Sequence, residues 1–253
     1  MEHLREYYDH RYREGYRNVL AGAERARSKA LVHVLSKLLR VSQSARVLDY
    51  GSGSGLHIAT WRCVFPQADL YFCDISPVAL TKLCAAHPEY HAHCAEITER
   101  GASFADRSFD VVVSVEVMEH VASTAAYLHD IYRLLKPNGT FVWTTPCANR
   151  GSIEHLYSLV TGQIEATPEG FRRWRWEDPS HLRRLRSREV RQRLQRVGFT
   201  DIGFRFRAHF FSFVCGYGFR GPLRGIGQRL LFLDYALFRR LPNGASMIGF
   251  ARK

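Results

Sequence analysis

The stretch VLDYGSGSG, residues 47–55, decides the fold of this chain, because an apolar run passes through an acidic residue into three closely spaced glycines. The apolar run predicts a buried strand, and the glycines predict a tight turn where the backbone approaches a ligand closely. Residues 56–65 follow with a pattern compatible with a helix. A strand, a glycine turn and a helix in this order are typical of the ligand-binding edge of an α/β sheet.

Three further apolar runs lie downstream, at intervals that leave room for helices. They are LYFCDI at 70–75, FDVVVSVE at 109–116 and GTFVWTTP at 139–146. Helices are expected between them at 77–87 and 122–135, the second closed by the stop signal KPNG at 136–139. This alternation predicts an α/β fold with a doubly wound parallel sheet.

The flanking segments complete a single domain over residues 1–253. Residues 1–40 have helical spacing and are interpreted as an N-terminal helical cover, before a cofactor-binding core at 41–150. Residues 151–253 are interpreted as a substrate-binding or lid region, beginning with an insertion at 151–180 that lacks a clean period. Within it we expect a helix at 187–197, a strand at 199–206 and a last strand at 246–251, pairing antiparallel in the sheet interior.

The composition is that of a globular protein with excess positive charge. The 253 residues are 46% hydrophobic, which excludes collagen-like, coiled-coil and largely disordered classes. With 36 Lys and Arg against 24 Asp and Glu, the net charge is +12. This charge favours anionic partners such as nucleic acid, phosphorylated metabolites, phospholipid surfaces or diphosphate-linked glycans.

Cysteine spacing and hydropathy help to predict the cellular compartment of the protein. The six cysteines contain no Cys-x-x-Cys pair, so neither a zinc site nor a disulfide framework is indicated. The N-terminal sequence MEHLREYYDHRYREGYR lacks the apolar centre of a secretory signal. The nearly apolar run 230–238 is far shorter than the roughly 20 residues that cross a bilayer. A cytoplasmic protein is expected.

The glycine spacing narrows the choice of ligand. Gly51, Gly53 and Gly55 form Gly-x-Gly-x-Gly, which departs from the Gly-x-Gly-x-x-Gly of dinucleotide sites. Asp49 stands just before the turn, where it would repel a phosphate but suit a ligand with an amino or sulfonium group. Asp74, at the end of the second apolar run, is placed to accept hydrogen bonds from two ribose hydroxyls. Together these features describe S-adenosylmethionine.

Four ordered motifs, VLDYGSGSG, FCDIS, FDVVVSVEVMEHV and LLKPNGTFVWTTP, resemble those of class I S-adenosylmethionine-dependent methyltransferases over residues 45–146. A weaker match is HLRRLRSREVRQRLQRVGF, residues 181–199. The resemblance implies a Rossmann-like, seven-stranded sheet and a small-molecule, glycan or quinone-type branch of the family. The cofactor contacts assigned here are Asp49, Gly51, Ser52, Gly53, Asp74, Ile75, Ala95, Glu96 and Glu116.

Within that resemblance, Asp49 and the glycine turn would hold the methionine part, Asp74 the ribose, and Ile75 would pack on adenine. Cys94 stands where relatives commonly have an acidic residue that meets the adenine amine, so the Ala95 backbone or Glu96 would substitute for it. The aromatic residues near the N-terminus resemble a cover over the cofactor, a packed or solvated helix end being the alternative. They are Tyr7, Tyr8 and Tyr12, with Arg13 beside them.

The motif EVMEH, residues 116–120, follows the third apolar run at its carboxyl end, which faces the ligand crevice of an open α/β sheet. Glu116, Glu119, His120 and the distant His181 resemble the metal site of two methyltransferase groups that act on vicinal oxygens, those of small-RNA 3′ ends and of ubiquinone precursors. A divalent ion such as Mg²⁺ is one interpretation of this set. Without metal, Glu119, His120 and His181 are candidate catalytic residues, with a histidine as the base, and a role in shaping the pocket is the alternative.

Two basic or apolar segments each allow two interpretations. Residues 171–196 contain ten arginines and three acidic residues. This segment is interpreted either as a positively charged, aromatic wall that holds phosphate groups, or as a solvated helix face. Residues 209–241 are rich in Phe and Leu with arginines at the edges. This segment is interpreted either as an amphipathic lid resting on the anionic inner face of a membrane, or as core packing or a homodimer face.

The leading functional hypothesis is O-methylation of a small-molecule, glycan or lipid-linked substrate that is anionic or apolar. The first alternative is an RNA ribose 2′-O-methyltransferase, favoured by the positive charge, although the sequence contains no recognisable RNA-binding module. The second alternative is a regulator that binds S-adenosylmethionine without turning it over.

Overall fold

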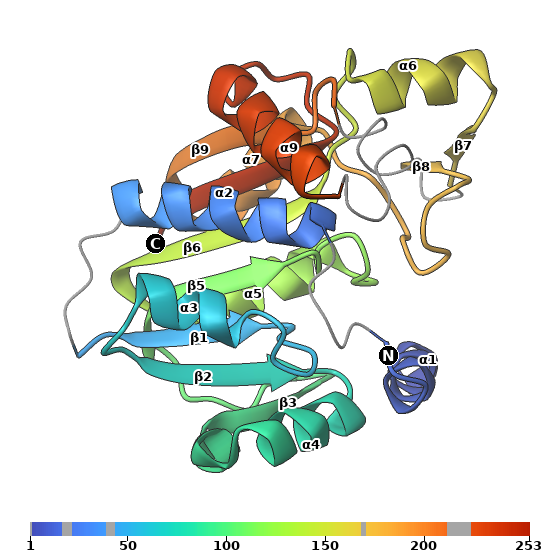
Figure 1. The fold of residues 1–253 in the computed structure, drawn as a ribbon. Helices are drawn as coiled ribbons and strands as arrows, with labels where there is room; N and C mark the ends of the chain where they lie inside the picture. The colour runs from blue at the N-terminus through green and yellow to red at the C-terminus, as the bar shows by residue number, and fades with distance from the viewer. Residues whose placement is uncertain (1, 17–21, 39–43, 168–170, 212–223) are drawn as a thin grey trace.

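A mixed eight-stranded sheet organises the chain in the computed structural model, which describes residues 2–16, 22–38, 44–167, 171–211 and 224–253 (Figure 1). The strand order is β4-β3-β2-β1-β5-β6-β10-β9. The strands are β1 (Arg46–Tyr50), β2 (Asp69–Asp74), β3 (Cys94–Thr98), β4 (Gly101–Ala102), β5 (Phe109–Val115), β6 (Leu135–Pro146), β9 (Thr200–Arg207) and β10 (Ser246–Arg252).

The sheet is parallel from β3 to β6, and β10 runs antiparallel between β6 and β9. The predicted α/β class and the antiparallel last strand are therefore confirmed. The predicted count of seven strands is approximate, because the two-residue β4 adds an eighth, antiparallel to β3. The strand order reverses beside β1, so the crevice for a ligand lies at the carboxyl end of that strand.

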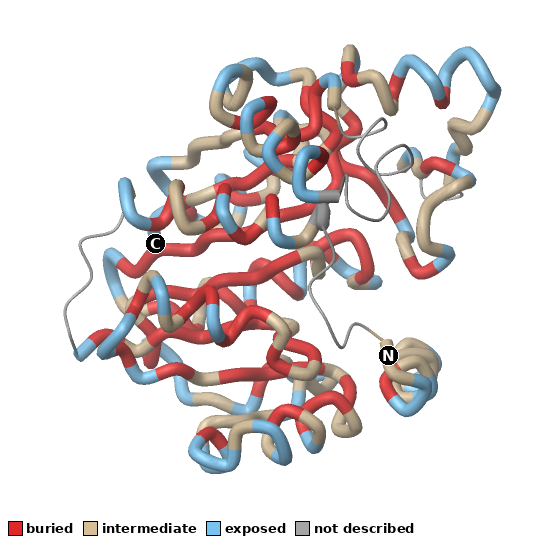
Figure 2. The backbone as a smooth tube through the Cα atoms, in the orientation of Figure 1, coloured by how far each residue is buried: buried red, intermediate tan, exposed pale blue. Residues whose placement is uncertain are grey.

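Helices cover both faces of the sheet. One face packs against α2 (Gly22–Leu38), α3 (Ile58–Val64), α4 (Pro77–Ala86) and α9 (Arg224–Phe238), and the other against α5 (Thr124–Leu134) and α7 (Ser187–Val197). Figure 2 shows the central strands as the most deeply buried part of the chain. Trp61 and Trp143 are fully buried, one on each face. Burying a large apolar side chain stabilises the fold by about 2 kcal/mol, so the two layers hold the sheet rigidly.

Short polar signals set the helix boundaries near the site. The Ser76 hydroxyl accepts a hydrogen bond from the Ala79 backbone and starts α4, and Ser123 does the same for α5 through Ala126. Gly198, with φ of 110°, ends α7 in the left-handed conformation. The helices expected at 77–87, 122–135 and 187–197 are confirmed to within two residues at each end.

The N-terminal 40 residues form two helices with different positions. Helix α1 (Glu2–Arg13) lies at the carboxyl edge of the strands, whereas α2 belongs to the helical layer beside α9 (Figure 1). The described part of the 209–241 tail is mainly α9, which buries Leu231, Asp234 and Tyr235, so core packing accounts for one of its faces. Residues 212–223 of that tail lie outside the described residues.

The insertion at 151–180 contains regular structure that its sequence did not reveal. Helix α6 (Ile153–Val160) precedes an antiparallel hairpin of β7 (Ile164–Ala166) and β8 (Arg172–Trp174). A short 3-10 helix, η1 (Pro88–His93), also precedes β3. Over the residues that are described, no helix has the length and apolarity required to cross a bilayer.

Candidate active site

The glycine turn after β1 has the backbone conformation that the sequence predicts. Gly51 and Gly53 have φ of 80° and 55°, values that favour glycine. The Gly51 and Ser52 amides donate to the Cys73 carbonyl at 2.8 and 3.0 Å, which ties the turn to β2. A Cβ on Gly53 would lie 2.3 Å from the Tyr12 hydroxyl, so a side chain there would displace the ring that covers the turn.

Asp74 closes the other side of this turn. Its carboxylate accepts hydrogen bonds from the backbone amides of Gly53 at 2.8 Å and Ser76 at 2.9 Å. Burial raises the pKa of Asp74 to about 6, despite the lowering effect of these amides. A carboxylate has about four acceptor positions, and the amides of Gly53, Ser76 and Ile75 occupy up to three of them, which leaves about one for a ribose hydroxyl.

Asp49 lies beneath the turn and is 2% exposed. It accepts a hydrogen bond of 2.6 Å from the indole nitrogen of Trp61. Burial and the nearby charge of Asp74 together raise the pKa of Asp49 to about 7, against the lowering effect of the hydrogen bond from Trp61. The two acidic residues that the sequence singled out therefore lie at the same turn.

The residues expected near adenine lie at the ends of β2 and β3. Ile75 directly follows β2 and is half-buried, and Ala95 pairs in register with Cys73. Glu96 is exposed and forms a salt bridge of 3.5 Å with Arg5 of α1. Glu96 is therefore directed toward α1, whereas Ile75 and Ala95 stay beside the turn.

Helix α1 is anchored at this edge from several sides. Arg11 pairs with Asp178 at 2.7 Å, and the Tyr8 hydroxyl donates to the Ser180 hydroxyl at 3.3 Å. The Ser76 hydroxyl donates to Asp9. Of the expected cover, Tyr7, Tyr8 and Tyr12 are at least partly buried and Arg13 is exposed.

The reactive cluster comprises Glu119, His120 and His181, whose candidate ligand atoms all lie within 4.8 Å of one another. His120 is oriented by a 3.0 Å contact between its Nδ1 and the Ser180 carbonyl. Because a carbonyl only accepts, this contact favours a proton on Nδ1, so that Nε2 is the unprotonated nitrogen of the neutral ring. The Tyr8 ring meets His120 edge-on at 5.8 Å between centroids, so α1 also encloses the cluster.

Glu119 is fully buried, and only one of its two carboxyl oxygens has a hydrogen-bond partner among the described residues. Oε2 accepts a 3.0 Å hydrogen bond from Thr145, whereas Oε1 has no hydrogen-bond partner within the described ranges. Burial, followed by the charge of Glu116, raises the pKa of Glu119 to about 8. Burial lowers the pKa of His181, but Glu177 and Glu119 outweigh it and leave that pKa raised. Burial thus favours the neutral form of Glu119, whereas the neighbouring carboxyl groups favour the charged form of His181.

Glu116 differs from the other candidate ligands, because it lies outside this three-residue cluster. Its carboxylate contacts Arg27 of α2 at 3.2 Å and accepts a 2.8 Å hydrogen bond from Thr144. The backbone of Glu116 has φ of 55°, an uncommon conformation for a residue other than glycine. The structure thus directs Glu116 toward α2 and β6.

Glu177 is a site residue that the sequence reasoning did not single out. Its Oε2 lies 3.7 Å from Nδ1 of His181, and its other oxygen accepts a 2.6 Å hydrogen bond from Arg184. Burial raises the pKa of Glu177, but Arg184 and His181 outweigh it and bring that pKa to about 2. The four-residue spacing of Glu177 and His181 was the available signal, although no regular helix produces it here.

Comparison with known proteins agrees with this geometry. A family model described as a methyltransferase domain matches residues 20–202, and the chain belongs to that family. A ubiquinone biosynthesis O-methyltransferase of Alkalilimnicola ehrlichii is 30% identical over 148 residues, which are 56% of this chain and 58% of that protein. One from Cereibacter sphaeroides is 31% identical over 136 residues, 52% of this chain and 53% of that protein. The chain thus matches somewhat more than half the length of these relatives.

Solved structures show the same fold. A phosphoethanolamine N-methyltransferase 2 of Haemonchus contortus, in complex with S-adenosyl-L-methionine, matches with a TM-score of 0.56 and 18% identity, covering 89% of this chain and 52% of that one. An S-adenosylmethionine-dependent methyltransferase of Mesorhizobium loti matches with a TM-score of 0.55 and 18% identity, covering 88% of this chain and 98% of that one. The fold is that of class I S-adenosylmethionine-dependent methyltransferases.

Proposed function

We propose that this protein transfers a methyl group from S-adenosylmethionine to an oxygen of a small molecule. The observation that carries the proposal is the orientation of His120, whose Nδ1 contacts a backbone carbonyl while Nε2 lies 3.8 Å from buried Glu119. This arrangement suits a general base beside the glycine turn. The relatives named as ubiquinone biosynthesis O-methyltransferases support oxygen as the acceptor atom.

The chain supplies binding, orientation and proton transfer. When bound, S-adenosylmethionine would provide an electrophilic methyl group on a sulfonium sulfur. The glycine turn and Asp74 would hold the nucleoside end, with Asp49 adding negative charge beneath. His120 Nε2 would accept the hydroxyl proton as the acceptor oxygen bonds to the methyl carbon and the carbon–sulfur bond breaks, its electron pair staying on sulfur. Above the pKa of about 8 of Glu119, its carboxylate would stabilise the resulting imidazolium.

We also infer that Glu119, His120 and His181 can hold a divalent cation. One carboxylate and two imidazoles suit Zn²⁺ or Fe²⁺ better than Mg²⁺, which prefers oxygen ligands, and Glu116 already contacts Arg27. If metal supports turnover, treatment with EDTA should reduce the initial rate at least tenfold, and one of these ions should restore it. An unchanged rate after EDTA, with a metal analysis below about 0.1 ion per chain, would exclude a metal role.

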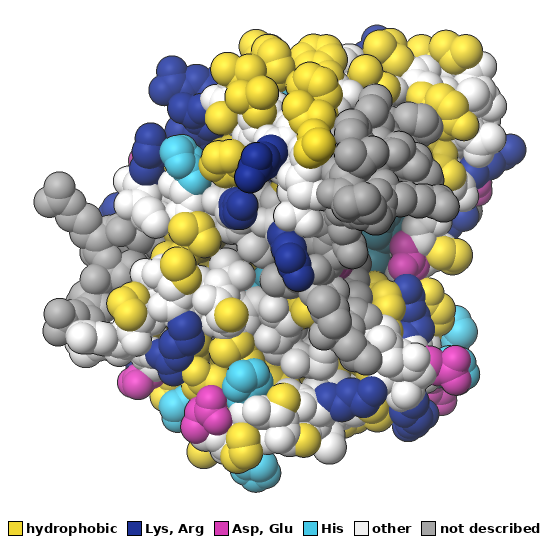
Figure 3. All heavy atoms as spheres, viewed as in Figure 1, with side chains coloured by type: hydrophobic (Ala, Val, Ile, Leu, Met, Phe, Trp, Pro, Cys, Tyr) yellow, Lys and Arg dark blue, Asp and Glu magenta, His cyan; other side chains and the backbone are white. Residues whose placement is uncertain are grey.

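A contact surface is favoured by side chains exposed near the insertion. Figure 3 shows hydrophobic side chains gathered over α9 and α6. They include Leu156, Leu159 and Val160 of α6, and Leu233 and Leu237 of α9, which are 46–85% exposed. A surface of this kind suits an anionic leaflet or a second copy of the chain.

The experiment that tests the proposal uses methyl-labelled S-adenosylmethionine and a cell extract separated into lipid, polysaccharide, RNA, protein and small-molecule fractions. Label in the lipid, polysaccharide or small-molecule fraction, at an ether oxygen by mass spectrometry, is the expected result. Label in RNA would replace the proposal by ribose 2′-O-methylation. Tight cofactor binding with no label in any fraction would favour the regulator that binds without turnover.

A further inference from the structure

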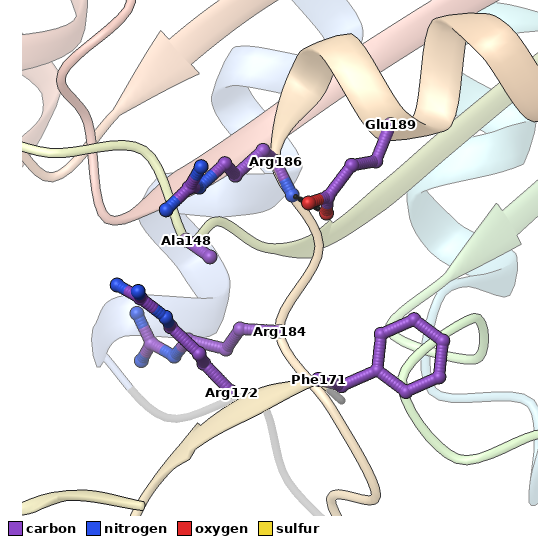
Figure 4. A pocket seen from close by; sticks show the side chains of 6 residues that line it. All are labelled: Ala148, Phe171, Arg172, Arg184, Arg186 and Glu189. Carbon is purple, nitrogen blue, oxygen red and sulfur yellow. Dashed lines mark hydrogen bonds between the residues drawn. The ribbon is translucent and has the colours of Figure 1, made fainter. Parts of the chain in front are cut away.

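A second polar pocket lies next to the segment that carries His181. Its volume is about 200 Å³, enough for a phosphate or carboxylate group with a few waters. It is lined by Ala148, Phe171, Arg172, Arg184, Arg186 and Glu189 (Figure 4). The three guanidinium groups lie on the same side of the pocket as Ala148, whereas the Phe171 ring turns away (Figure 4).

The arginines of the basic segment differ in their partners. Arg173 and Arg175 lie near Glu165, at 3.8 and 3.5 Å. Arg183 is buried and donates to Thr124 at 3.0 Å. Arg184 is 5% exposed and pairs with Glu154 at 3.2 Å and with Glu177. These four arginines therefore have structural roles.

Arg172 and Arg186 line the pocket, and neither side chain forms an ion pair with a carboxylate among the residues described; the same is true of the four arginines of α7, which lie outside the pocket. The one acidic residue of the pocket, Glu189, accepts a 2.9 Å hydrogen bond from the Arg186 backbone amide. Its carboxylate is thereby directed to the backbone rather than to a guanidinium, as Figure 4 shows. Two guanidinium groups that line one small pocket, with no carboxylate partner in the described part of the chain, match the geometry of an oxyanion.

A buried histidine near the pocket has the same positively charged surroundings. His155 of α6 is 6% exposed, and its Nδ1 has no hydrogen-bond partner in the described part of the chain. Burial lowers the pKa of His155, and four arginines lower it further: Arg150, Arg172, Arg186 and Arg184. Like charges gathered around one point repel each other, so a bound anion would stabilise the cluster.

The pocket and the reactive cluster share one segment of chain. The Leu182 amide donates to the Glu119 carbonyl at 3.0 Å, and the Ala148 amide donates to the Leu185 carbonyl at 3.0 Å. The chain from His181 to Arg186 spans at most about 17 Å, so one elongated acceptor can reach both places. Arg184 also joins the two, since its partner Glu177 contacts His181.

We propose that Arg172 and Arg186 bind a phosphate or carboxylate group of the methyl acceptor and so position its hydroxyl at His120. The inference rests on the proposed function for the identity of the acceptor, but anion binding itself requires neither cofactor nor turnover. The proposed acceptor is a water-soluble molecule, long enough for its anionic group to reach the pocket while its hydroxyl lies at His120.

Titration calorimetry with inorganic pyrophosphate in about 0.1 M NaCl tests the binding step. The wild-type protein should bind one pyrophosphate per chain. Arg172→Gln and Arg186→Gln should each weaken binding about tenfold, and the double variant should show no saturable binding. Arg188→Gln is the matched control, because Arg188 is exposed on the same helix outside the pocket and should leave binding unchanged.

The outcomes separate this inference from the proposed function. Absent binding of both pyrophosphate and phosphatidylglycerol vesicles by the wild-type protein, or equal pyrophosphate binding by the double variant with unchanged circular dichroism and cofactor affinity, would overturn the anion site. Pyrophosphate binding without labelled product would retain the site and reject the methyl-transfer proposal. Phosphatidylglycerol vesicles are the second ligand to be tested. Binding through Arg172 and Arg186 to vesicles but not to pyrophosphate would overturn the proposal of a soluble acceptor in favour of a lipid headgroup.

Discussion

At the scale of single residues, burial decides the chemistry of the site. Asp49, Asp74 and Glu119 lie in desolvated surroundings, and burial raises the pKa of each above that of a carboxyl in water. Glu177 is buried too, yet Arg184 lowers its pKa to about 2, so it keeps its charge. The same residue type therefore performs different tasks a few ångströms apart.

Cofactor affinity should depend on pH near neutrality. The pKa of Asp49 is raised to about 7 and that of Asp74 to about 6, so both carboxyls become protonated as the pH falls from 8 to 5. Protonation removes the negative charge that attracts a sulfonium cation, so we expect the affinity to fall by up to about tenfold per pH unit for each proton taken up. Calorimetry with S-adenosylmethionine from pH 5 to 8 measures this.

The Asp74→Asn variant removes the protonation of Asp74 and so isolates the effect of protonating Asp49. Its affinity should be lower at pH 8, and the pH dependence near pH 6 should disappear. The pH dependence due to Asp49 should stay but move to lower pH, because the charge of Asp74 raises the pKa of Asp49. Asp69→Asn is the control, because Asp69 is exposed at the other end of β2. An affinity that is constant from pH 5 to 8 in the wild-type protein would refute the assigned role of both carboxyls.

Removing the proposed base should affect turnover and not cofactor binding. We expect His120→Ala to lower kcat by about 10²- to 10⁴-fold, since general base catalysis contributes about that much. Cofactor affinity should stay within about twofold of wild type, because the described contacts of His120 are with Ser180, Glu119, Tyr8 and His181. His129→Ala, at an exposed position of α5, is the control. Equal kcat for the two variants would remove His120 from the mechanism.

At the scale of elements, the site is assembled by segments far apart in the sequence. Helix α1 reaches the edge of the sheet through Arg11 and Asp178, which are separated by 167 positions. The segment 178–182 then connects α1 to His120 and Glu119 through Ser180 and Leu182. Closure of the site therefore depends on the contact between α1 and this segment.

Weakening that contact should loosen α1. In Arg11→Ala the ion pair with Asp178 is lost, which costs about 1 kcal/mol because both side chains are partly exposed. Amide hydrogen exchange in α1 should accelerate about fivefold, with little change in the central strands. Arg13→Ala is the control, since Arg13 is exposed in the same last turn of α1. Unchanged exchange in Arg11→Ala would show that the other contacts hold α1 without this ion pair.

At the scale of the whole molecule, the antiparallel strand β10 connects the parallel part of the sheet to its edge, because it pairs with β6 on one side and with β9 on the other. Gly249 pairs with Trp143 of β6, and a Cβ at Gly249 would lie 2.1 Å from the Trp143 ring. Trp143 is fully buried and cannot move aside without disturbing its neighbours. This one contact limits how closely the two strands can pack.

Two glycine substitutions should change stability in opposite directions. Gly249→Ala overpacks the core, and we expect the free energy of unfolding to fall by about 1–3 kcal/mol. Gly225→Ala meets nothing within 4 Å in α9, and replacing a helical glycine should raise stability by up to about 1 kcal/mol. Thermal unfolding of both variants measures this. A melting temperature in Gly249→Ala equal to wild type would contradict the described packing.

The sequence by itself determined the α/β class, the glycine turn and the acidic residues at the strand ends, because local periodicity and turn chemistry depend on neighbouring residues. It also indicated Glu119 and His120, since strand ends meet at one edge of a parallel sheet, whereas His181 was indicated by the resemblance to a methyltransferase metal site. Only the tertiary structure decided the pairing of Glu116 with Arg27, the contact of Glu177 with His181 and the division of the arginines into buried and unpaired groups. Those properties depend on desolvation and on which distant segments pack together, and neither is encoded in local spacing.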